Sequence, residues 1–236
     1  ESTLPCDYPE AMQFSRTLQL LLYQIHHANP ALRQVYLLKV DISDGFYRLR
    51  LRPHDAPKLA LIMPPYDGEP QLVAVPLACT MGWTNSPPSF CALSKTITDL
   101  TYAQLYRHNV PTHWLASLAG AHDEPPGRRP NAALPPHHGL TCLPDVHRPD
   151  TGNQATQPLA SVDAFVDHFI KLAQGGPRQR EALRNTLLHT IDDVLEPHPN
   201  HPTRKEAASV KKMTKGEVAW ATRKTALGWI IDSLSK

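Results

Sequence analysis

An aspartate and a histidine stand side by side in an otherwise apolar stretch, FVDHFI at residues 165–170. Carboxylate and imidazole side chains are the usual groups for acid–base catalysis and for binding metal ions. The pair Asp167-His168 therefore has three interpretations: a catalytic pair, half of a metal site, or an altered form of a site that once held another residue. The choice among them depends on a second carboxylate, Asp41, far upstream in the chain.

Both carboxylates are expected at the ends of strands. Residues 35–41, VYLLKVD, form a mostly apolar run that closes on Asp41, which is typical of a buried strand with a carboxylate at its end. Two short β-prone runs within residues 161–176 meet near Asp167 and His168. They predict a tight hairpin with these two residues at or near its tip.

The other elements follow from hydrophobic periodicity and from the positions of proline and glycine. They are a helical segment within residues 1–30, a hairpin formed by residues 58–65 and 71–77, a helix that Ser86 can cap, a helix from Pro177 to Pro197, a basic stretch over residues 204–224 and a short strand at residues 226–232. This order predicts an α+β fold in which helices pack on one face of a largely antiparallel sheet.

Composition divides the chain into four parts. They are an N-terminal helical segment (1–30), a part with Asp41, the hairpin and the helix after MGWTNSPPSF (31–107), an insertion rich in Pro and His (108–160), and a part with FVDH, a helix and LGWII (161–236). We expect the insertion to be poorly ordered. Its His137, His138, Cys142 and His147 could bind a metal ion, but a proline-broken polar loop is the favoured interpretation, because structural zinc sites need tighter spacing.

The overall composition is that of an ordinary globular protein. Of the 236 residues 41% are hydrophobic and 19% charged, and the net charge of +2 neither indicates nor excludes nucleic-acid binding. The four cysteines form no C-x-x-C pair and are interpreted as reduced thiols. No apolar run reaches the length of a membrane span and no signal peptide is visible, so we expect an intracellular protein of the cytoplasm or nucleus. The chain begins with Glu, as a fragment or processed product would.

Four stretches, in this order, resemble the motifs of the palm domain of retroelement reverse transcriptases. KVDISDGFYRLRL (39–51) resembles the first motif, in which an Asp ends a strand and an aromatic follows a turn. VPLACTMGWTNSPPSF (75–90) is similar to the proline-glycine stretch before a helix, FVDH (165–168) to the aromatic-x-Asp-Asp box, and ALGWII (226–231) to the Leu-Gly-x-x-Ile motif that contacts the primer. From the resemblance we expect incomplete fingers and no thumb, so the chain resembles a palm-domain fragment of a retrotransposon enzyme.

The resemblance implies an RNA-directed DNA polymerase that works by two-metal nucleotidyl transfer. Two Mg²⁺ ions, or Mn²⁺ in their place, would be held by Asp41, Asp167 and the backbone carbonyl of Ile42. The partners implied are an RNA template, a DNA primer and a deoxynucleoside triphosphate, with no role for a membrane. The missing subdomains of the polymerase would lie on a longer polyprotein.

Three residues match positions at which the family binds the nucleotide. Phe46 stands where an aromatic packs beneath the sugar and blocks a 2′-hydroxyl, although a core aromatic is an equal alternative. Met81 and Gly82 match the lining of the nucleotide pocket, and Met81 departs from the usual polar or aromatic residue there, so its contact would be apolar.

Five residues match or surround the position of the primer. The resemblance implies that Gly228 lets a backbone approach the primer and that Trp229 packs on a sugar, with a buried tryptophan as the alternative. Lys211, Lys212 and Lys224 belong to a basic run that could contact phosphates, in a salt-sensitive and sequence-independent way, or could simply be solvated.

His168 departs from the family, whose box ends in two aspartates. An imidazole is neutral or positive near neutral pH and prefers softer metals than Mg²⁺, so this position has lost a negative charge beside the expected metal ions. We therefore expect polymerase activity to be impaired; the alternative is a catalytically inactive relic with at most nucleic-acid binding. Two further interpretations remain open: a general base paired with Asp167, and a ligand adapted to Mn²⁺.

Overall fold

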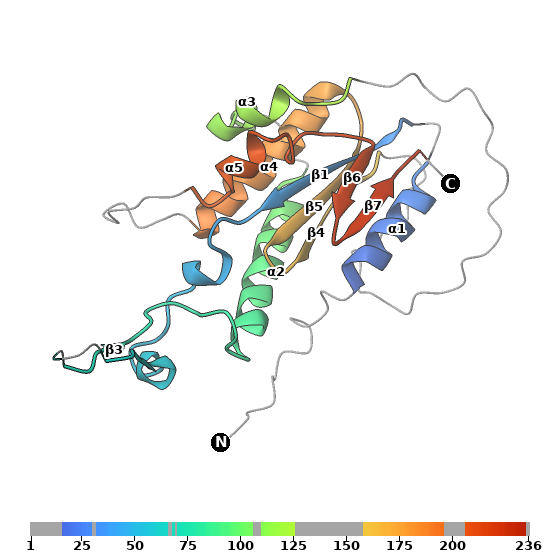
Figure 1. Cartoon of the computed structure of the whole chain (residues 1–236). Coiled ribbons are helices and arrows are strands. Elements are labelled where there is room, and N and C mark those ends of the chain that lie inside the picture. The colour runs from blue at the N-terminus through green and yellow to red at the C-terminus, as the bar shows by residue number, and fades with distance from the viewer. Residues whose placement is uncertain are drawn as a thin grey trace.

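The centre of the molecule is a three-stranded antiparallel sheet in the order β1-β5-β4 (Figure 1). The computed structural model describes residues 16–29, 32–65, 68, 70–105, 110–125, 158–195 and 206–234. The strands are β1 (Val35–Asp41), β4 (Ala160–Phe165) and β5 (His168–Gln174). Asp41 pairs with His168, and Phe165 pairs with His168 from the other side. The expected strand and hairpin are thus confirmed, and they meet at one end of the sheet.

Two long helices cover one face of this sheet. They are α2 (Ser86–Gln104) and α4 (Pro177–Leu195), and both were predicted. Alternate residues of a strand point to opposite faces of a sheet, so every second side chain of β1 and β5 meets these helices. The resulting core contains Leu38, Val40, Phe169 and Ala173 from the strands, Phe90 and Ile97 from α2, and Leu187 and Ile191 from α4.

The opposite face is covered at one end by α1 (Thr17–His27) and by a hairpin of β6 (Arg223–Ala226) and β7 (Trp229–Asp232). A second core joins them to the sheet through Leu21, Val35, Leu37, Ile170, Leu172, Ala226 and Ile231. The α+β prediction is confirmed, but the expectation that helices lie on one face only is wrong. Strands β1 and β5 carry apolar residues on both faces, and a sheet of this kind has to be covered on both sides.

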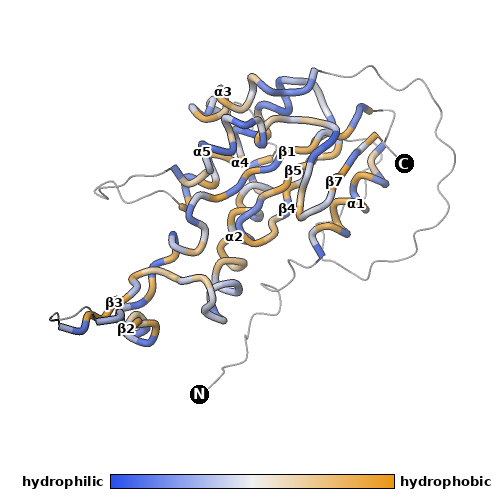
Figure 2. Tube along the Cα trace, viewed as in Figure 1, coloured by the Kyte–Doolittle hydropathy of each residue, from blue (hydrophilic) through white to orange (hydrophobic). Residues whose placement is uncertain are grey.

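The predicted hairpin ahead of α2 is present but short. Strands β2 (Leu61–Ile62) and β3 (Val73–Ala74) pair antiparallel, and they project away from the central sheet (Figure 1). Figure 2 shows apolar residues along this projection. The exposed ones include Leu61, Ile62, Met63, Leu72, Val73, Val75 and Leu77. An apolar surface of this kind is a common sign of contact with another part of a protein or with a partner.

Part of the expected insertion is folded, contrary to the prediction. Residues 110–125 include α3 (Trp114–Gly120), whose buried Leu115 packs in the core beside α4. His113 caps α3, because its Nδ1 accepts a hydrogen bond from the Leu115 N–H at 3.1 Å, while its Nε2 lies 2.8 Å from Asp192 Oδ2. Histidine is not a usual N-cap residue, so no residue at this position indicates the start of a helix. The metal candidates His137, His138, Cys142 and His147 lie outside the described residues.

Smaller elements refine the prediction elsewhere. A short helix α5 (Val210–Met213) interrupts the basic run, and two 3-10 helices, η2 (Gly45–Arg48) and η3 (Ala56–Leu59), follow β1. Ser86 does not cap α2, since its hydroxyl donates to the Thr80 carbonyl at 2.7 Å. Among the helices of the described segments, none combines the length and apolarity needed to cross a membrane.

Candidate functional site

The turn that carries Asp167 is fixed by its neighbours. Val166 and Asp167 connect β4 to β5, and Val166 has a φ of 53°, which is a strained value for a β-branched residue. The Ser94 hydroxyl on α2 donates to the Val166 carbonyl at 2.5 Å, and the Ile42 N–H donates to the Asp167 carbonyl at 2.9 Å. The turn is therefore hydrogen-bonded both to α2 and to Ile42, the residue that follows β1.

Ser94→Ala is expected to lower the free energy of unfolding by about 1 kcal/mol, because it removes the hydroxyl that binds the strained turn. Thr96→Ala is the matched control, since the exposed Thr96 hydroxyl bonds only within α2, to the Ala92 carbonyl. We expect the control to change stability by less than about 0.5 kcal/mol. Urea denaturation of both variants measures the difference, and equal losses would contradict the role of Ser94.

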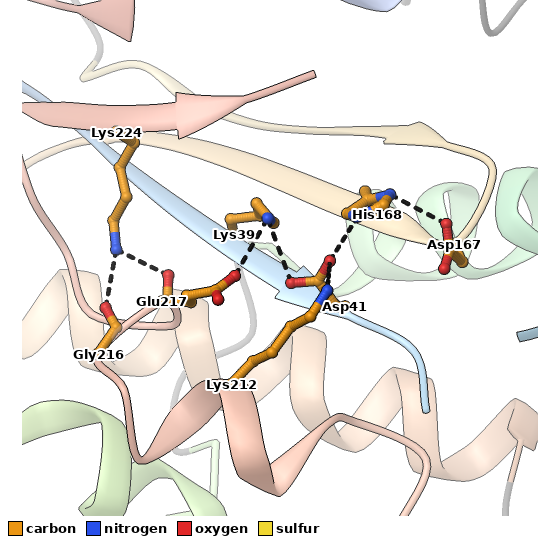
Figure 3. Close-up of polar contacts among 8 residues, drawn as sticks. All are labelled: Lys39, Asp41, Asp167, His168, Lys212, Gly216, Glu217 and Lys224. Carbon is orange, nitrogen blue, oxygen red and sulfur yellow. Dashed lines mark hydrogen bonds and ion pairs between the residues drawn. The ribbon is translucent and has the colours of Figure 1, made fainter. Parts of the chain in front are cut away.

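Asp41 is buried and surrounded by positive charge (Figure 3). Its side chain is 1% exposed, and Oδ1 lies 2.6 Å from His168 Nε2 and 2.7 Å from the ammonium of Lys212 on α5. Its Oδ2 lies 3.5 Å from the ammonium of Lys39. Burial raises the pKa of Asp41, but the contacts with His168 and Lys212 outweigh it and bring the pKa to about 2. Asp41 is thus a carboxylate facing three cations.

His168 lies between two carboxylates. Its Nε2 lies 2.6 Å from Asp41 Oδ1, and its Nδ1 lies 2.9 Å from Asp167 Oδ1. The contacts with Asp167 and Asp41 raise the pKa of His168 to about 9, against the effect of burial. The ring is therefore an imidazolium near neutral pH. This arrangement disfavours the general-base interpretation, which needs a deprotonated nitrogen.

The contacts extend into a balanced network, which we call the ion cluster. Lys39 also pairs with Glu217, at 3.1 Å from Oε2. The ion cluster thus sets three positive groups against three negative ones: Lys39, His168 and Lys212 against Asp41, Asp167 and Glu217. With one charge on each group it has no net charge, so it offers little attraction to a divalent cation.

The residues of the ion cluster do not fit a magnesium ion in this arrangement. Mg²⁺ requires oxygen ligands, and Asp41 and Asp167 supply carboxylates at the same end of the sheet. However, the Oδ1 atoms of Asp41 and Asp167 both face the ring of His168. The ammonium of Lys212 also contacts Oδ1 of Asp41, where a metal ion would have to bind. In the part of the chain that the structure describes, no three His, Cys, Asp or Glu side chains are grouped so that they could hold a metal ion.

The predicted nucleotide-binding residues lie on two segments. Phe46, on η2, is half-buried and its ring meets that of Phe90 edge to face, with centroids 5.4 Å apart. This contact supports the core-aromatic alternative for Phe46. Met81 and Gly82 lie in an exposed turn before α2, where Gly82 has a φ of 90°. Their contact with a nucleotide stays a prediction.

The predicted primer-contacting residues are divided between surface and interior contacts. Leu227 and Gly228, with φ values of 54° and 80°, form the two-residue turn between β6 and β7. Trp229 is 64% exposed, so it is not the buried tryptophan of the alternative interpretation. Lys224 is half-buried, and its ammonium donates to the carbonyls of Gly216 and Glu217 at 3.0 and 2.7 Å.

Burial lowers the pKa of Lys224 to about 8. Of the three predicted phosphate contacts, Lys211 is exposed, whereas the ammonium groups of Lys212 and Lys224 bind within the chain. Phosphate binding by all three stays a prediction.

The sequence interpretation missed three residues that shape the site: Lys39, Glu217 and Ser94. Lys39 stands two residues before Asp41 on a strand, and side chains at this spacing share a face, so the alternation of β1 contained the signal. Glu217 and Ser94 reach the site only through the packing of distant segments, and no local pattern indicates them.

No protein-family model matches this chain, and a search of curated proteins finds no match. The resemblance to reverse transcriptases therefore rests on the four sequence motifs alone.

Proposed function

We propose that the chain is the palm part of a retroelement reverse transcriptase, an RNA-directed DNA polymerase whose nucleotidyl transfer is impaired by His168. The observation that carries the proposal is the pairing of Asp41 with His168, next to Asp167. The first and third motifs are far apart in the sequence, yet their key residues meet at one end of an antiparallel sheet. Carboxylates that converge from separate strands are what a two-metal site requires.

The position of the fourth motif also supports the proposal. Asp41, Lys39 and Leu37 share one face of β1, and Leu37 belongs to the core beneath the β6–β7 hairpin. The ion cluster and the exposed Trp229 hairpin therefore belong to the same face of the sheet. An RNA template paired with a DNA primer would lie along this face, with Trp229 and Lys211 as exposed contacts and the deoxynucleotide near Asp41.

His168 would impair the reaction through its charge. An aspartate at this position would add a negative charge, whereas the imidazolium adds a positive one, so the two differ by two charges beside the place where metal ions would bind. When bound, the ions would activate the primer hydroxyl and neutralise the triphosphate. The chain's own contribution would be the carboxylates of Asp41 and Asp167, and both now face His168.

The ion cluster also supports a second candidate, a catalytically inactive relic that acts inside the cell at most by binding nucleic acid. In this case the charges of the cluster would serve only to hold the fold. The two candidates differ in whether a carboxylate at position 168 is enough to restore synthesis.

Primer extension on a primed RNA template separates the candidates. The natural chain is expected to extend no more than background in Mg²⁺ or Mn²⁺, and His168→Asp to extend at least about a hundredfold more, the size of effect that charge stabilisation in an active site commonly has. The matched control is Asp41→Asn/His168→Asp, which is expected to return to background.

Near-normal extension by the natural chain would refute the impairment. Failure of His168→Asp to extend, with folding verified by circular dichroism and nucleic-acid binding retained, would favour the inactive relic.

A further inference from the structure

One short segment supplies two members of the ion cluster. Residues 206–217 carry both Lys212, which binds Asp41, and Glu217, which binds Lys39. The segment is also joined to the end of β1 through its backbone: the Ser209 N–H donates to the Asp41 carbonyl at 2.9 Å, and the Ser43 N–H donates to the Ala207 carbonyl at 2.8 Å. These bonds set the start of α5 close beside Asp41.

We propose that Lys212 excludes divalent cations from Asp41 independently of His168. Its ammonium lies 2.7 Å from Asp41 Oδ1, a position beside the carboxylate that a bound cation would otherwise take. The inference deepens the proposed function, because it assumes that Asp41 descends from a metal ligand. It implies that the residue at position 168 is not the only feature that decides whether the site accepts metal.

Lys212 is better placed for this role than Lys39. The ammonium of Lys39 is farther from Asp41, at 3.5 Å, and is shared with Glu217 at 3.1 Å. Lys212 lies 2.7 Å from the carboxylate, and its side chain is 38% exposed, so a cation must first displace the ammonium into water before it can bind Asp41. Lys212 therefore acts as a competitor that weakens metal binding, and its removal has a measurable effect once position 168 is a carboxylate.

Binding of Mn²⁺, followed by electron paramagnetic resonance in the absence of nucleic acid, tests the inference. The whole chain is used with His168→Asp alone and with a second change, either Lys212→Gln or Lys215→Gln. Lys215 is the matched control because it is an exposed lysine on the same segment. Loss of Lys212 is expected to tighten Mn²⁺ binding about tenfold, as removal of a strong charged competitor would, and loss of Lys215 to change it less than about twofold.

A third change, Asp41→Asn, is expected to abolish the tight binding and so to locate it at Asp41. Equal affinity in the Lys212→Gln and Lys215→Gln chains would overturn the inference, as would an absence of Mn²⁺ binding when both His168 and Lys212 are replaced. The Mn²⁺ measurement does not depend on polymerisation, and primer extension is measured separately. A tenfold effect without primer extension would leave the exclusion intact and reject the proposed function; extension without the tenfold effect would do the reverse.

Discussion

Lys171→Met is expected to raise the free energy of unfolding by about 3 kcal/mol at pH 6. Lys171 is 0% exposed, in the middle of β5 and on the face that α4 covers, and its ammonium donates to the Leu183 carbonyl at 2.7 Å. Burial lowers the pKa of Lys171 from 10.5 to about 7. Below pH 7 the folded chain must keep an ammonium in its core, and methionine removes this cost while it fills a similar volume.

The pH dependence gives this prediction its sign. The unfolded chain protonates Lys171 up to pH 10.5 and the folded chain only up to about pH 7, so this residue makes stability rise between these values. His168 acts in the opposite direction. Its pKa is about 9 in the folded chain and 6.5 ordinarily, so this residue makes stability fall as the pH rises from 6.5 to about 9. The two effects oppose each other between pH 7 and 9 in the natural chain.

Without Lys171 the effect of His168 remains, and stability is expected to fall by about 1 kcal/mol per pH unit over that window. Urea denaturation from pH 6 to pH 10 measures both profiles. Lys215→Met is the control, because Lys215 is exposed and its removal should leave the pH profile of the natural chain unchanged. A Lys171→Met chain that is less stable at pH 6, or whose profile matches the natural one, would contradict the prediction.

Asp41→Asn is expected to lower the free energy of unfolding by about 2 to 3 kcal/mol. The change keeps the size of the side chain but leaves Lys39, His168 and Lys212 facing a neutral group at the end of β1. The loss stays below that of a fully buried ion pair, because these cations are partly exposed and can turn toward water. Thermal or urea unfolding at pH 7 measures it.

Asp99→Asn provides the matched control for this change. Asp99 also pairs with a lysine, Lys95, but both side chains are exposed, and an exposed pair contributes little to stability. We expect the control to lie within about 0.5 kcal/mol of the natural chain. Equal losses of unfolding free energy at the two positions would show that Asp41 contributes no more than a member of an exposed ion pair.

Much of the fold could be predicted because its signals are local. Strand β1 has the bounds that its apolar run indicated, and α4 begins at Pro177 as the position of that proline suggested. The β4–β5 hairpin turns at Val166–Asp167, where the two β-prone runs meet. By contrast α3 is capped by His113 and stabilised by packing on α4, and neither feature has a local pattern.

The site was predictable only in its acidic half. The motif order predicted that Asp41 and Asp167 belong together, and the structure brings both carboxylates to His168. The pairing of Asp41 with Lys212 could not be predicted, because it depends on how residues 206–217 dock on the end of β1. Similarly, the exposure of Trp229 follows from the hairpin that presents it, and the motif itself was compatible with a buried residue.

The most direct test of the ion cluster measures how Asp41→Asn changes the unfolding temperature in two backgrounds, at pH 7 and without divalent cations. In the natural chain we predict a decrease, because Asp41 balances the cations around it. In the His168→Asp/Lys212→Gln background we predict an increase, because Asp41 then stands beside two other carboxylates that repel it. An increase or no change in the natural chain would contradict the account, since Asp41 would then not be held by Lys39, His168 and Lys212.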